Sequence, residues 1–478
     1  MRGVRRVALG MAFSFFMLSL GLVYWQVVQT DSLLENNANR RLILMEKRVT
    51  RGGIFDRNGE IIAQTQTSKG KKERVYPKGE LFEPLLGYST VKLGAAGLEG
   101  SLAEWLLGIK KATPTQAVQQ LFALPRQGDD VVLTLDTRLQ SIAYNALKGK
   151  VGAVVALDPR TGEVLALVSQ PSFDPTTIDQ DMAKIIDDEG KRAVDKKQDP
   201  LSNHAFSKFT PGSVMKVVTS AALFRSGLNT TDLYNSTGSA NINGQVITEQ
   251  NGKAFGWVNY NMALAHSCNA YFATFGVKAG DKQFLSATKG FGFGQEIPFE
   301  LYVPPSSITK AAEFPATLTP NLLAASAFGQ GEVMVTPFHM ALIMAGIANH
   351  GVIMTPHIVE RVLDPMQAVI FQQKPQPWLT ALSKEEADKI TSAMVTAVTD
   401  GTASPGAIPN VQVAAKTGSA EPGGNVKTHG WYIAFAPAEA PRIAIAVIVE
   451  HGGTGGGAAA PIARQIMQEA LSQKVGGK

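Results

Sequence analysis

The sequence contains a single cysteine, Cys268, among 478 residues. One thiol cannot form an intrachain disulfide, and it cannot complete a zinc site that needs two thiolates. The seven histidines form no His-x-x-x-His pair and do not gather with carboxylates along the chain, so a histidine-based metal site is not predicted either. We therefore expect no bound metal and no covalent cross-link within the chain.

The chain also has little excess of either charge. The chain has 45 Lys and Arg residues against 40 Asp and Glu residues, which gives a formal net charge of +5, and no basic run forms a stripe. Nucleic-acid-binding proteins carry a strongly basic surface, so no nucleic-acid partner is expected. Hydrophobic residues make up 45% of the chain, which excludes wholesale disorder.

Long apolar runs are absent except for one near the start, residues 7–28. As a helix this run is roughly 33 Å long, enough to cross a hydrocarbon core of about 30 Å. A cleaved signal peptide is the alternative, but its apolar region is only about 7–15 residues long. Arg2, Arg5 and Arg6 precede the run, and positive charge stays on the cytoplasmic side. We predict a single-pass anchor in a bacterial plasma membrane, with residues 1–6 in the cytoplasm and the remaining chain outside.

Short-range signals divide the outer part of the chain in two. Within residues 29–150, Asn58-Gly59 between β-prone flanks predicts a hairpin, because both residues tolerate the turn conformation. Residues 131–136 predict a strand, and residues 137–147 predict a helix. We expect this part to form a smaller N-terminal pedestal domain.

The second part, residues 151–478, has strand patterns at both ends and mainly helical patterns from 213 to about 350. The predicted strands cover residues 152–157, 163–168, 411–415, 430–436 and 442–450. Strands that enclose helices in this way imply an α+β domain, with an antiparallel sheet flanked by helices.

The first candidate for chemistry is a serine followed three residues later by a lysine. Pro211-Gly212-Ser213 reads as a turn that enters a helix, which would place Lys216 on the same face as Ser213. A serine hydroxyl becomes a strong nucleophile when a base removes its proton, and a neutral lysine can be that base. The pKa of the lysine would have to fall from about 10.4 to about 7, and burial or a second nearby cation would lower it. Alone, Ser-x-x-Lys is more often just the start of a helix.

Two later fragments supply the other groups that acyl transfer by this serine and lysine would need. Ser267-x-Asn269 adds a hydroxyl and an amide, and Lys416-Thr417-Gly418 adds a cation at the end of a predicted strand. Ser-x-x-Lys, Ser-x-Asn and Lys-Thr-Gly, in this order, are the signature of the penicillin-binding and β-lactamase superfamily.

Beyond the three motifs, the sequence resembles a class B penicillin-binding protein, a monofunctional D,D-transpeptidase of bacterial cell-wall synthesis. Residues 51–59 resemble the N-terminal hairpin of that class. Residues 152–175 resemble the opening strands of its transpeptidase domain, and residues 329–337 resemble a segment between its second and third motifs. The resemblance implies a β-lactamase/transpeptidase-like fold over residues 151–478, preceded by a short, dimerisation-like pedestal.

The resemblance also implies a role for each motif residue. Ser213 attacks the carbonyl between the two D-alanines of a peptidoglycan stem peptide, and Lys216 is its general base. Ser267 relays a proton to the departing D-alanine, and Asn269 holds a substrate amide and orients Lys216. An amine from a neighbouring stem then resolves the acyl-enzyme and forms the crosslink, and β-lactams acylate Ser213 in the same way.

The third motif is implied to bind the substrate carboxylate. Lys416 supplies a positive charge that attracts the carboxylate and lowers the pKa of the general base. Thr417, Gly418 and Ser419 form the carboxylate site, and the oxyanion lies between the backbone N–H groups of Ser213 and Ser419. No cofactor is implied.

The implied partners are peptidoglycan stem peptides, β-lactams, the plasma membrane and a polytopic cell-wall glycosyltransferase of the shape, division or sporulation type. Two other functions remain open. A D,D-carboxypeptidase or β-lactamase-like hydrolase would resolve its acyl-enzyme with water. A non-catalytic β-lactam sensor or scaffold would not need the Ser213 hydroxyl for its cellular role.

Overall fold

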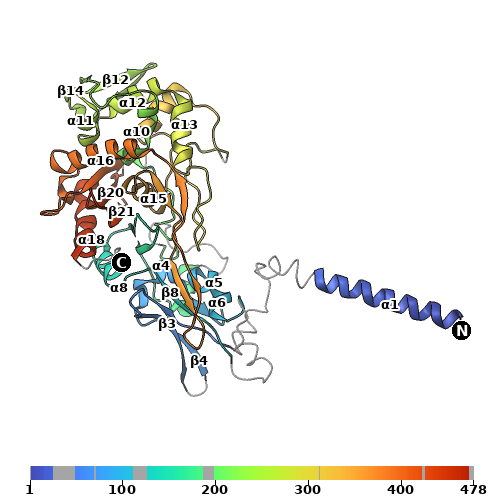
Figure 1. The fold of residues 1–478 in the computed structure, drawn as a ribbon. Helices are drawn as coiled ribbons and strands as arrows, with labels where there is room; N and C mark the ends of the chain where they lie inside the picture. Colours follow the sequence, from blue (N-terminus) through green and yellow to red (C-terminus); the bar gives the residue numbers. More distant parts are fainter. Residues whose placement is uncertain are drawn as a thin grey trace.

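The computed structural model describes residues 2–24, 49–68, 71–110, 126–186, 199–311, 313–421 and 426–472. Figure 1 shows two sheet-containing regions, a smaller one that holds most of the N-terminal part of the chain and a larger one that carries most of the helices. Helix α1 (Arg2–Val23) is drawn apart from both.

The larger region is built on a five-stranded antiparallel sheet in the order β10-β9-β21-β20-β19. Its strands are β9 (Gly152–Leu157), β10 (Val164–Gln170), β19 (Ala414–Ala420), β20 (His429–Ala436) and β21 (Ile443–Val449). Two strands from the start of this region pair with three from its end, which confirms the predicted α+β arrangement.

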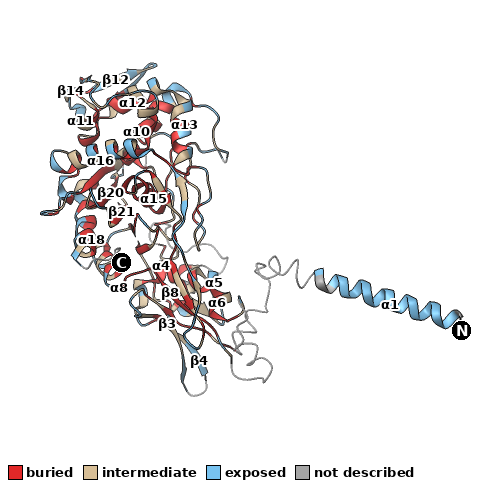
Figure 2. Ribbon diagram, viewed as in Figure 1, coloured by how far each residue is buried: buried red, intermediate tan, exposed pale blue. Residues whose placement is uncertain are grey.

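Helices cover both faces of this sheet. They are α8 (Thr137–Leu147), α15 (Pro337–Ala348) and α18 (Ala460–Ser472). Alternate side chains of β21 point to opposite faces: Ala446 and Ile448 pack on the side of α15. Ile445 and Val447 pack on the side of α8 and α18. Burial on both faces explains why these strands read as almost continuous apolar runs, and Figure 2 shows the resulting core.

A further group of helices lies next to the sheet and carries two of the motifs (Figure 1). Its members are α10 (Lys216–Arg225), α11 (Tyr260–Ala265), α12 (Asn269–Ala279), α13 (Asp281–Gly290), α14 (Pro320–Ala327) and α16 (Lys384–Thr399). α10 packs against α12, α13 and α16, and α16 packs against strand β19. The turn that leads into α10, Gly212–Met215, also packs against β19, so the beginning of α10 lies beside a strand of the central sheet.

Part of the stretch predicted to be helical forms two small ribbons instead. The paired strands are β12 (Ser239–Ile242) with β13 (Gln245–Thr248), and β11 (Tyr234–Ser236) with β14 (Gly256–Val258). Asn243 and Gly244 form the turn between β12 and β13, at φ 53° and 85°. Helices dominate the rest of the stretch as predicted, and here Asn-Gly between β-prone residues is the same hairpin signal as at Asn58-Gly59.

The smaller region contains a six-stranded sheet in the order β17-β16-β8-β2-β3-β4. Its strands are β2 (Ile54–Phe55), β3 (Ile61–Ser68), β4 (Lys71–Val75), β8 (Asp130–Leu133), β16 (Val359–Leu363) and β17 (Val369–Gln372). The predicted hairpin joins β2 and β3, with Gly59 at φ 85°. β16 pairs with β8, so this sheet takes two of its strands from beyond residue 150.

Short elements fill the remaining described parts. The helices are α4 (Glu83–Leu86), α5 (Gly97–Ser101), α6 (Ala103–Leu106), α9 (Ile178–Ile185) and α17 (Gly455–Ala458). The strand pairs are β1 (Val49–Thr50) with β7 (Arg126–Gln127), β5 (Ser89–Thr90) with β6 (Gly94–Ala95), and β15 (Val352–Met354) with β18 (Pro377–Thr380).

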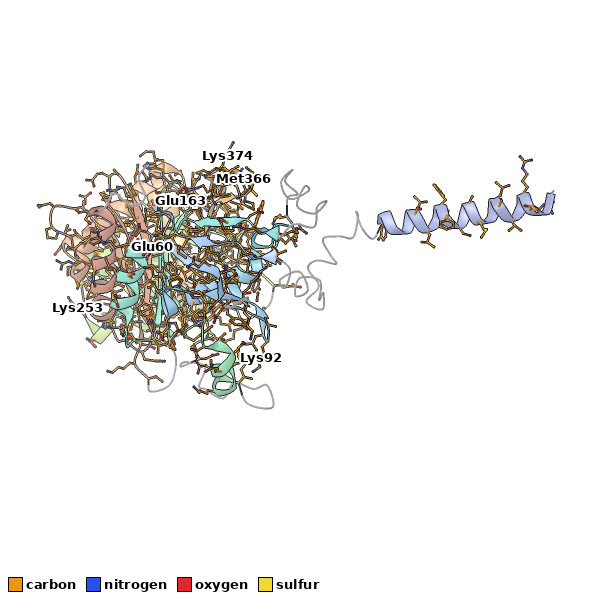
Figure 3. All side chains as sticks on the ribbon, turned by 90° about the horizontal axis from the view of Figure 1, so that it is seen from below. Glu60, Lys92, Glu163, Lys253, Met366 and Lys374 are labelled. Atoms are coloured by element: carbon orange, nitrogen blue, oxygen red, sulfur yellow. The ribbon has the colours of Figure 1, made fainter. Side chains whose placement is uncertain are left out.

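Within the described chain, α1 is long and apolar enough to cross a membrane, over Gly3–Gly21. None of that span is buried, and Figure 3 shows the side chains of α1 projecting from the helix without neighbours from the rest of the molecule. The helix begins at Arg2, earlier than the predicted start of the apolar run at residue 7. Trp25 and Gln26, which the sequence placed in the same run, lie outside the described residues.

A buried ion cluster links separate segments of the smaller region. Glu99 is fully buried, and its carboxylate lies 2.7 Å from Nε of Arg51 and 2.7 Å from Nε of Arg74. Arg74 also donates to the carbonyl of Gly52 at 2.7 Å. Burial alone would raise the pKa of Glu99, but the two guanidiniums outweigh burial and lower it, so the carboxylate stays charged.

We predict that Glu99→Gln lowers the free energy of unfolding by about 3–5 kcal/mol, because two guanidiniums would remain buried without their counter-charge. Asp388→Asn is the matched control. Asp388 pairs with Lys384 at 2.5 Å on the surface, and the loss of such a pair costs less than about 1 kcal/mol. Denaturant unfolding of the full-length chain in detergent measures both. Equal effects of the two substitutions would contradict the stabilising role of the cluster.

Candidate active site

Ser213 lies in a 3₁₀ turn, Gly212–Met215, that leads directly into helix α10. Its side chain is half-buried. The Gly212 N–H donates to the carbonyl of Gly329 at 2.8 Å, and a side chain at position 329 would come within 1.8 Å of the carbonyl oxygen of Gly212. Glycine at 329, with φ 84°, therefore lets the two loops approach and fixes the turn that presents the Ser213 hydroxyl.

Lys216 is fully buried, and its Nζ lies within hydrogen-bond distance of four oxygen atoms. The distances are 3.0 Å to Ser213 Oγ, 2.7 Å to the Ser267 carbonyl, 3.1 Å to Ser267 Oγ and 2.8 Å to Asn269 Oδ1. A neutral amine has a lone pair, so the contact with Ser213 can reverse and the hydroxyl can donate its proton to Lys216. This is the geometry that a general base needs.

Ser267 connects the two lysines of the site. Its Oγ also lies 3.0 Å from Nζ of Lys416, which donates in addition to the carbonyl of Thr417 at 2.8 Å. Ser267 has φ 63°, in the left-handed region that non-glycine residues rarely adopt. Such strained backbone persists where the surroundings fix it, and here both the hydroxyl and the carbonyl of Ser267 contact Lys216.

Two buried amines so close together cannot both hold a proton easily. Burial lowers the pKa of Lys216 to about 8, and the negative charge of Glu249 opposes this shift. Burial also lowers the pKa of Lys416 well below its ordinary value, and the positive charge of Lys216 lowers it further. Burial, one of the causes that the sequence analysis named, is thus the main cause at Lys216. The two amines interact, so they titrate as a coupled pair, and both pKa values lie below that of an ordinary lysine.

The third motif lies inside strand β19, whereas the sequence predicted a strand that ends at residue 415. β19 continues through Ala420 because it pairs with β20 along its whole length, and this pairing overrides the weak strand propensity of the glycine. A side chain at Gly418 would lie 3.0 Å from the carbonyl oxygen of Pro211. Glycine at this position therefore lets β19 pack against the turn that carries Ser213.

The other residues of the third motif lie close to the same turn. Ser419 is half-buried, and a side chain built at Gly212 would come within 3.0 Å of its carbonyl oxygen, so the end of β19 runs beside the backbone of Ser213. Thr417 is buried, and its Oγ1 lies 2.7 Å from Oγ1 of Thr402. Thr402 is outside the three motifs, so no sequence pattern pointed to it.

Asn269 is held from two sides. Its Oδ1 accepts from Lys216, and its Nδ2 donates to the carbonyl of Thr248 at 3.2 Å. Its backbone N–H donates to the carboxylate of Glu249 at 2.7 Å. Glu249 was missed as well, since a single glutamate after a short strand carries no recognisable pattern. Cys268, between Ser267 and Asn269, is buried and faces Glu249 rather than the lysines.

Two of the histidines lie closer to a carboxylate in space than their spacing along the sequence predicts. Among the residues that the structure describes, His429, Glu450 and His451 offer possible ligand atoms within 4.8 Å of one another. These groups already contact one another and His204. The His451 backbone N–H donates to Nδ1 of His429 at 3.2 Å, and Nδ1 of His204 lies 2.6 Å from Oε1 of Glu450. This cluster has no part in the acylation or the deacylation of Ser213 that the site geometry supports.

Comparison with known proteins gives matches over most of the chain. The family model described as penicillin binding protein transpeptidase domain matches residues 152–468, and the one described as penicillin binding protein A dimerisation domain matches residues 51–131. The peptidoglycan D,D-transpeptidase PbpA of Mycolicibacterium smegmatis is 33% identical, with 98% of this chain and 99% of that protein covered. The protein of the same name from Mycobacterium tuberculosis is 32% identical, with 98% of each covered.

Two solved structures of penicillin-binding protein A from M. tuberculosis resemble this one. Its ceftriaxone acyl-enzyme complex has a TM-score of 0.82 at 31% identity and covers 90% of this chain and 100% of that chain. Its penicillin G acyl-enzyme complex has a TM-score of 0.80 at 31% identity and covers 88% and 99%.

The lowered pKa of Lys216 predicts how the reactivity of Ser213 depends on pH. Only neutral Lys216 can accept the Ser213 proton, so the rate of acylation by penicillin G should rise about tenfold per pH unit up to about pH 8 and then level off. Stopped-flow acylation rates between about pH 6 and pH 10 measure this. A rate that falls with rising pH in this range would contradict Lys216 as the base.

The left-handed backbone of Ser267 predicts which of two variants, Ser267→Ala or Ser267→Gly, is the more stable. Ser267→Ala and Ser267→Gly both remove the hydroxyl and should abolish most acylation, but only glycine fits φ 63° without strain. Ser267→Gly should therefore be the more stable variant, by about 1 kcal/mol. At Ser286, exposed on helix α13, the order should be reversed, because glycine is the poorer helix former. Denaturant unfolding gives both orders, and the same order at both positions would contradict the strain at Ser267.

Proposed function

The chain belongs to the penicillin-binding protein transpeptidase family and is a class B peptidoglycan D,D-transpeptidase, and from that premise we propose that Ser213 is the residue that becomes acylated. Family membership confirms the resemblance that the three motifs carry. The observation that supports Ser213 is its 3.0 Å contact with Lys216, a buried amine whose pKa is lowered to about 8.

In the proposed acylation, Lys216 takes the proton of Ser213 while Oγ attacks the carbonyl carbon between the two D-alanines of a stem peptide. The carbonyl oxygen becomes an oxyanion between the backbone N–H groups of Ser213 and Ser419, and one such donor typically contributes about 3 kcal/mol. Collapse of the intermediate breaks the peptide bond. The proton passes from Lys216 through Ser267 Oγ to the departing amine of D-alanine, since Ser267 Oγ contacts Lys216 at 3.1 Å.

The acyl-enzyme is then resolved by the reverse sequence. An amine from a second stem loses a proton to the site and attacks the ester carbonyl. The bond to Ser213 Oγ breaks, the serine regains its proton, and a peptide crosslink is released. A β-lactam follows the first half of this path, and its ring-opened product stays attached to Ser213.

The substrate carboxylate is proposed to control where the proton of the lysine pair resides. Without substrate, burial and the positive charge of Lys216 both lower the pKa of Lys416. A carboxylate bound by Lys416, Thr417, Gly418 and Ser419 favours the ammonium form of Lys416 instead. Because the two amines share Ser267 Oγ, the same event favours neutral Lys216. Binding of substrate thus prepares the base.

We propose that the catalytic domain lies outside the plasma membrane. The apolar helix α1 begins with Arg2, Arg5 and Arg6, which supports a cytoplasmic N-terminus and a single-pass anchor. The family-model match over residues 51–131 supports a separate N-terminal domain within residues 29–150. The partner we propose is a polytopic glycosyltransferase, because a crosslinking enzyme needs newly polymerised glycan strands with intact stem peptides.

Penicillin G should add one penicillin mass to the wild-type chain and none to Ser213→Ala, measured by intact mass spectrometry of the full-length chain in detergent. Ser207→Ala, at a half-buried serine in the preceding loop, is the control and should be labelled like the wild type. An unlabelled wild type, or a labelled Ser213→Ala, would contradict the assignment. Rapid loss of the adduct with release of hydrolysed penicillin would favour the β-lactamase-like hydrolase instead.

A further inference from the structure

Glu249 stands outside the three motifs, directly after strand β13, and only 3% of it is exposed. Its carboxylate accepts hydrogen bonds from three consecutive residues that follow Ser267. Oε2 accepts the backbone N–H of Asn269 at 2.7 Å. Oε1 accepts the backbone N–H of Ala270 at 2.8 Å and the thiol of Cys268 at 2.9 Å. One buried side chain therefore holds the second motif where helix α12 begins.

These bonds occupy the N-terminus of α12. The first N–H groups of a helix have no acceptor within the helix, and a negative charge in front of them is favourable. Cys268, which immediately precedes the helix, provides no side-chain cap. Glu249 supplies the missing acceptor from a different element, so the ribbon that carries it determines where the first turn of α12 begins.

We propose that Glu249 is a positioning residue of the transpeptidase site, which holds Asn269 and Ser267 against Lys216 and places a negative charge near Lys216. This inference rests on the proposed function of Ser213. The backbone N–H of Cys268 donates to the carbonyl of Ala263 at 2.8 Å, which fixes the segment from the other side. Between these two attachments Ser267 keeps its left-handed conformation.

The charge of Glu249 acts on Lys216 in addition to the geometry. The titratable groups around Lys216 are Lys416 on β19, Cys268 and Glu249 itself, and the charge of Glu249 raises the pKa of Lys216 while burial lowers it. Burial and the neighbouring carboxylate raise the pKa of Cys268 to about 12, so the thiol keeps its proton and remains a donor. Removal of the carboxylate should therefore let Lys216 lose its proton at a lower pH.

The test compares pH profiles of acylation by penicillin G for the full-length chain. In Glu249→Gln, an amide N–H group replaces an acceptor that faced an N–H donor, so the rate at the plateau should fall at least about tenfold. The rising part of the profile should also move by about one pH unit toward acid, because the negative charge near Lys216 is gone. Glu249→Asp keeps the charge on a shorter side chain. It should restore the wild-type position of the profile, with a plateau between those of the wild type and Glu249→Gln.

Glu300→Gln is the matched control, since Glu300 also accepts two backbone N–H groups, those of Ile358 and Val359 at 3.0 and 2.9 Å, next to strand β16. It should leave the position of the pH profile unchanged even if it destabilises the protein. A Glu249→Gln variant with the wild-type profile, or with a lower plateau but no shift, would overturn the proposal. A wild-type chain that is not acylated at all would contradict the proposed function itself, so the two failures can be told apart.

Discussion

The site depends on two buried amines that share one hydroxyl. Lys216 and Lys416 both contact Ser267 Oγ, at 3.1 and 3.0 Å, and both are fully buried. Burial of an unpaired ammonium is costly, and two adjacent ammoniums would add their repulsion to that cost. The site accommodates them because each amine donates to nearby oxygen atoms and because burial lowers the pKa of both. Only the neutral form of Lys216 can take the Ser213 proton, so the lowered pKa of this amine is what makes the hydroxyl reactive.

This arrangement needs a rigid framework, since its parts come from distant stretches of chain. Lys416 lies on β19, which is held by β20 along its length, and β20 belongs to a sheet whose two faces are both covered. Ser213 and Lys216 begin a helix that packs on α12, α13 and α16. Two glycines, Gly329 and Gly418, remove the side chains that would keep these elements apart. Close backbone packing thus brings the reacting groups within hydrogen-bond distance.

The sequence predicts the parts of this protein that depend on local pattern. Helix 137–147 has the predicted bounds, and the Asn58-Gly59 hairpin forms as expected. The three motifs are recognisable in the sequence because the chemical role of each leaves few residue types possible. What the sequence did not reveal depends on tertiary contacts. Strand β16 joins the N-terminal sheet across more than two hundred residues, and Thr402 and Glu249 reach the site through the fold alone.

The left-handed backbone of Ser267 shows why sequence patterns do not reveal such contacts. The residues next to Ser267 in the sequence do not predict its φ of 63°, and serine does not favour this left-handed conformation. The conformation is stable only because Cys268 and Asn269 are fixed by partners on other elements, and because Lys216 binds the carbonyl that this conformation presents. The motif therefore specifies which atoms react, whereas residues outside it specify the angle at which they meet. The three motifs alone therefore do not hold this turn, because the buried carboxylate that accepts the N–H groups of Asn269 and Ala270 belongs to Glu249.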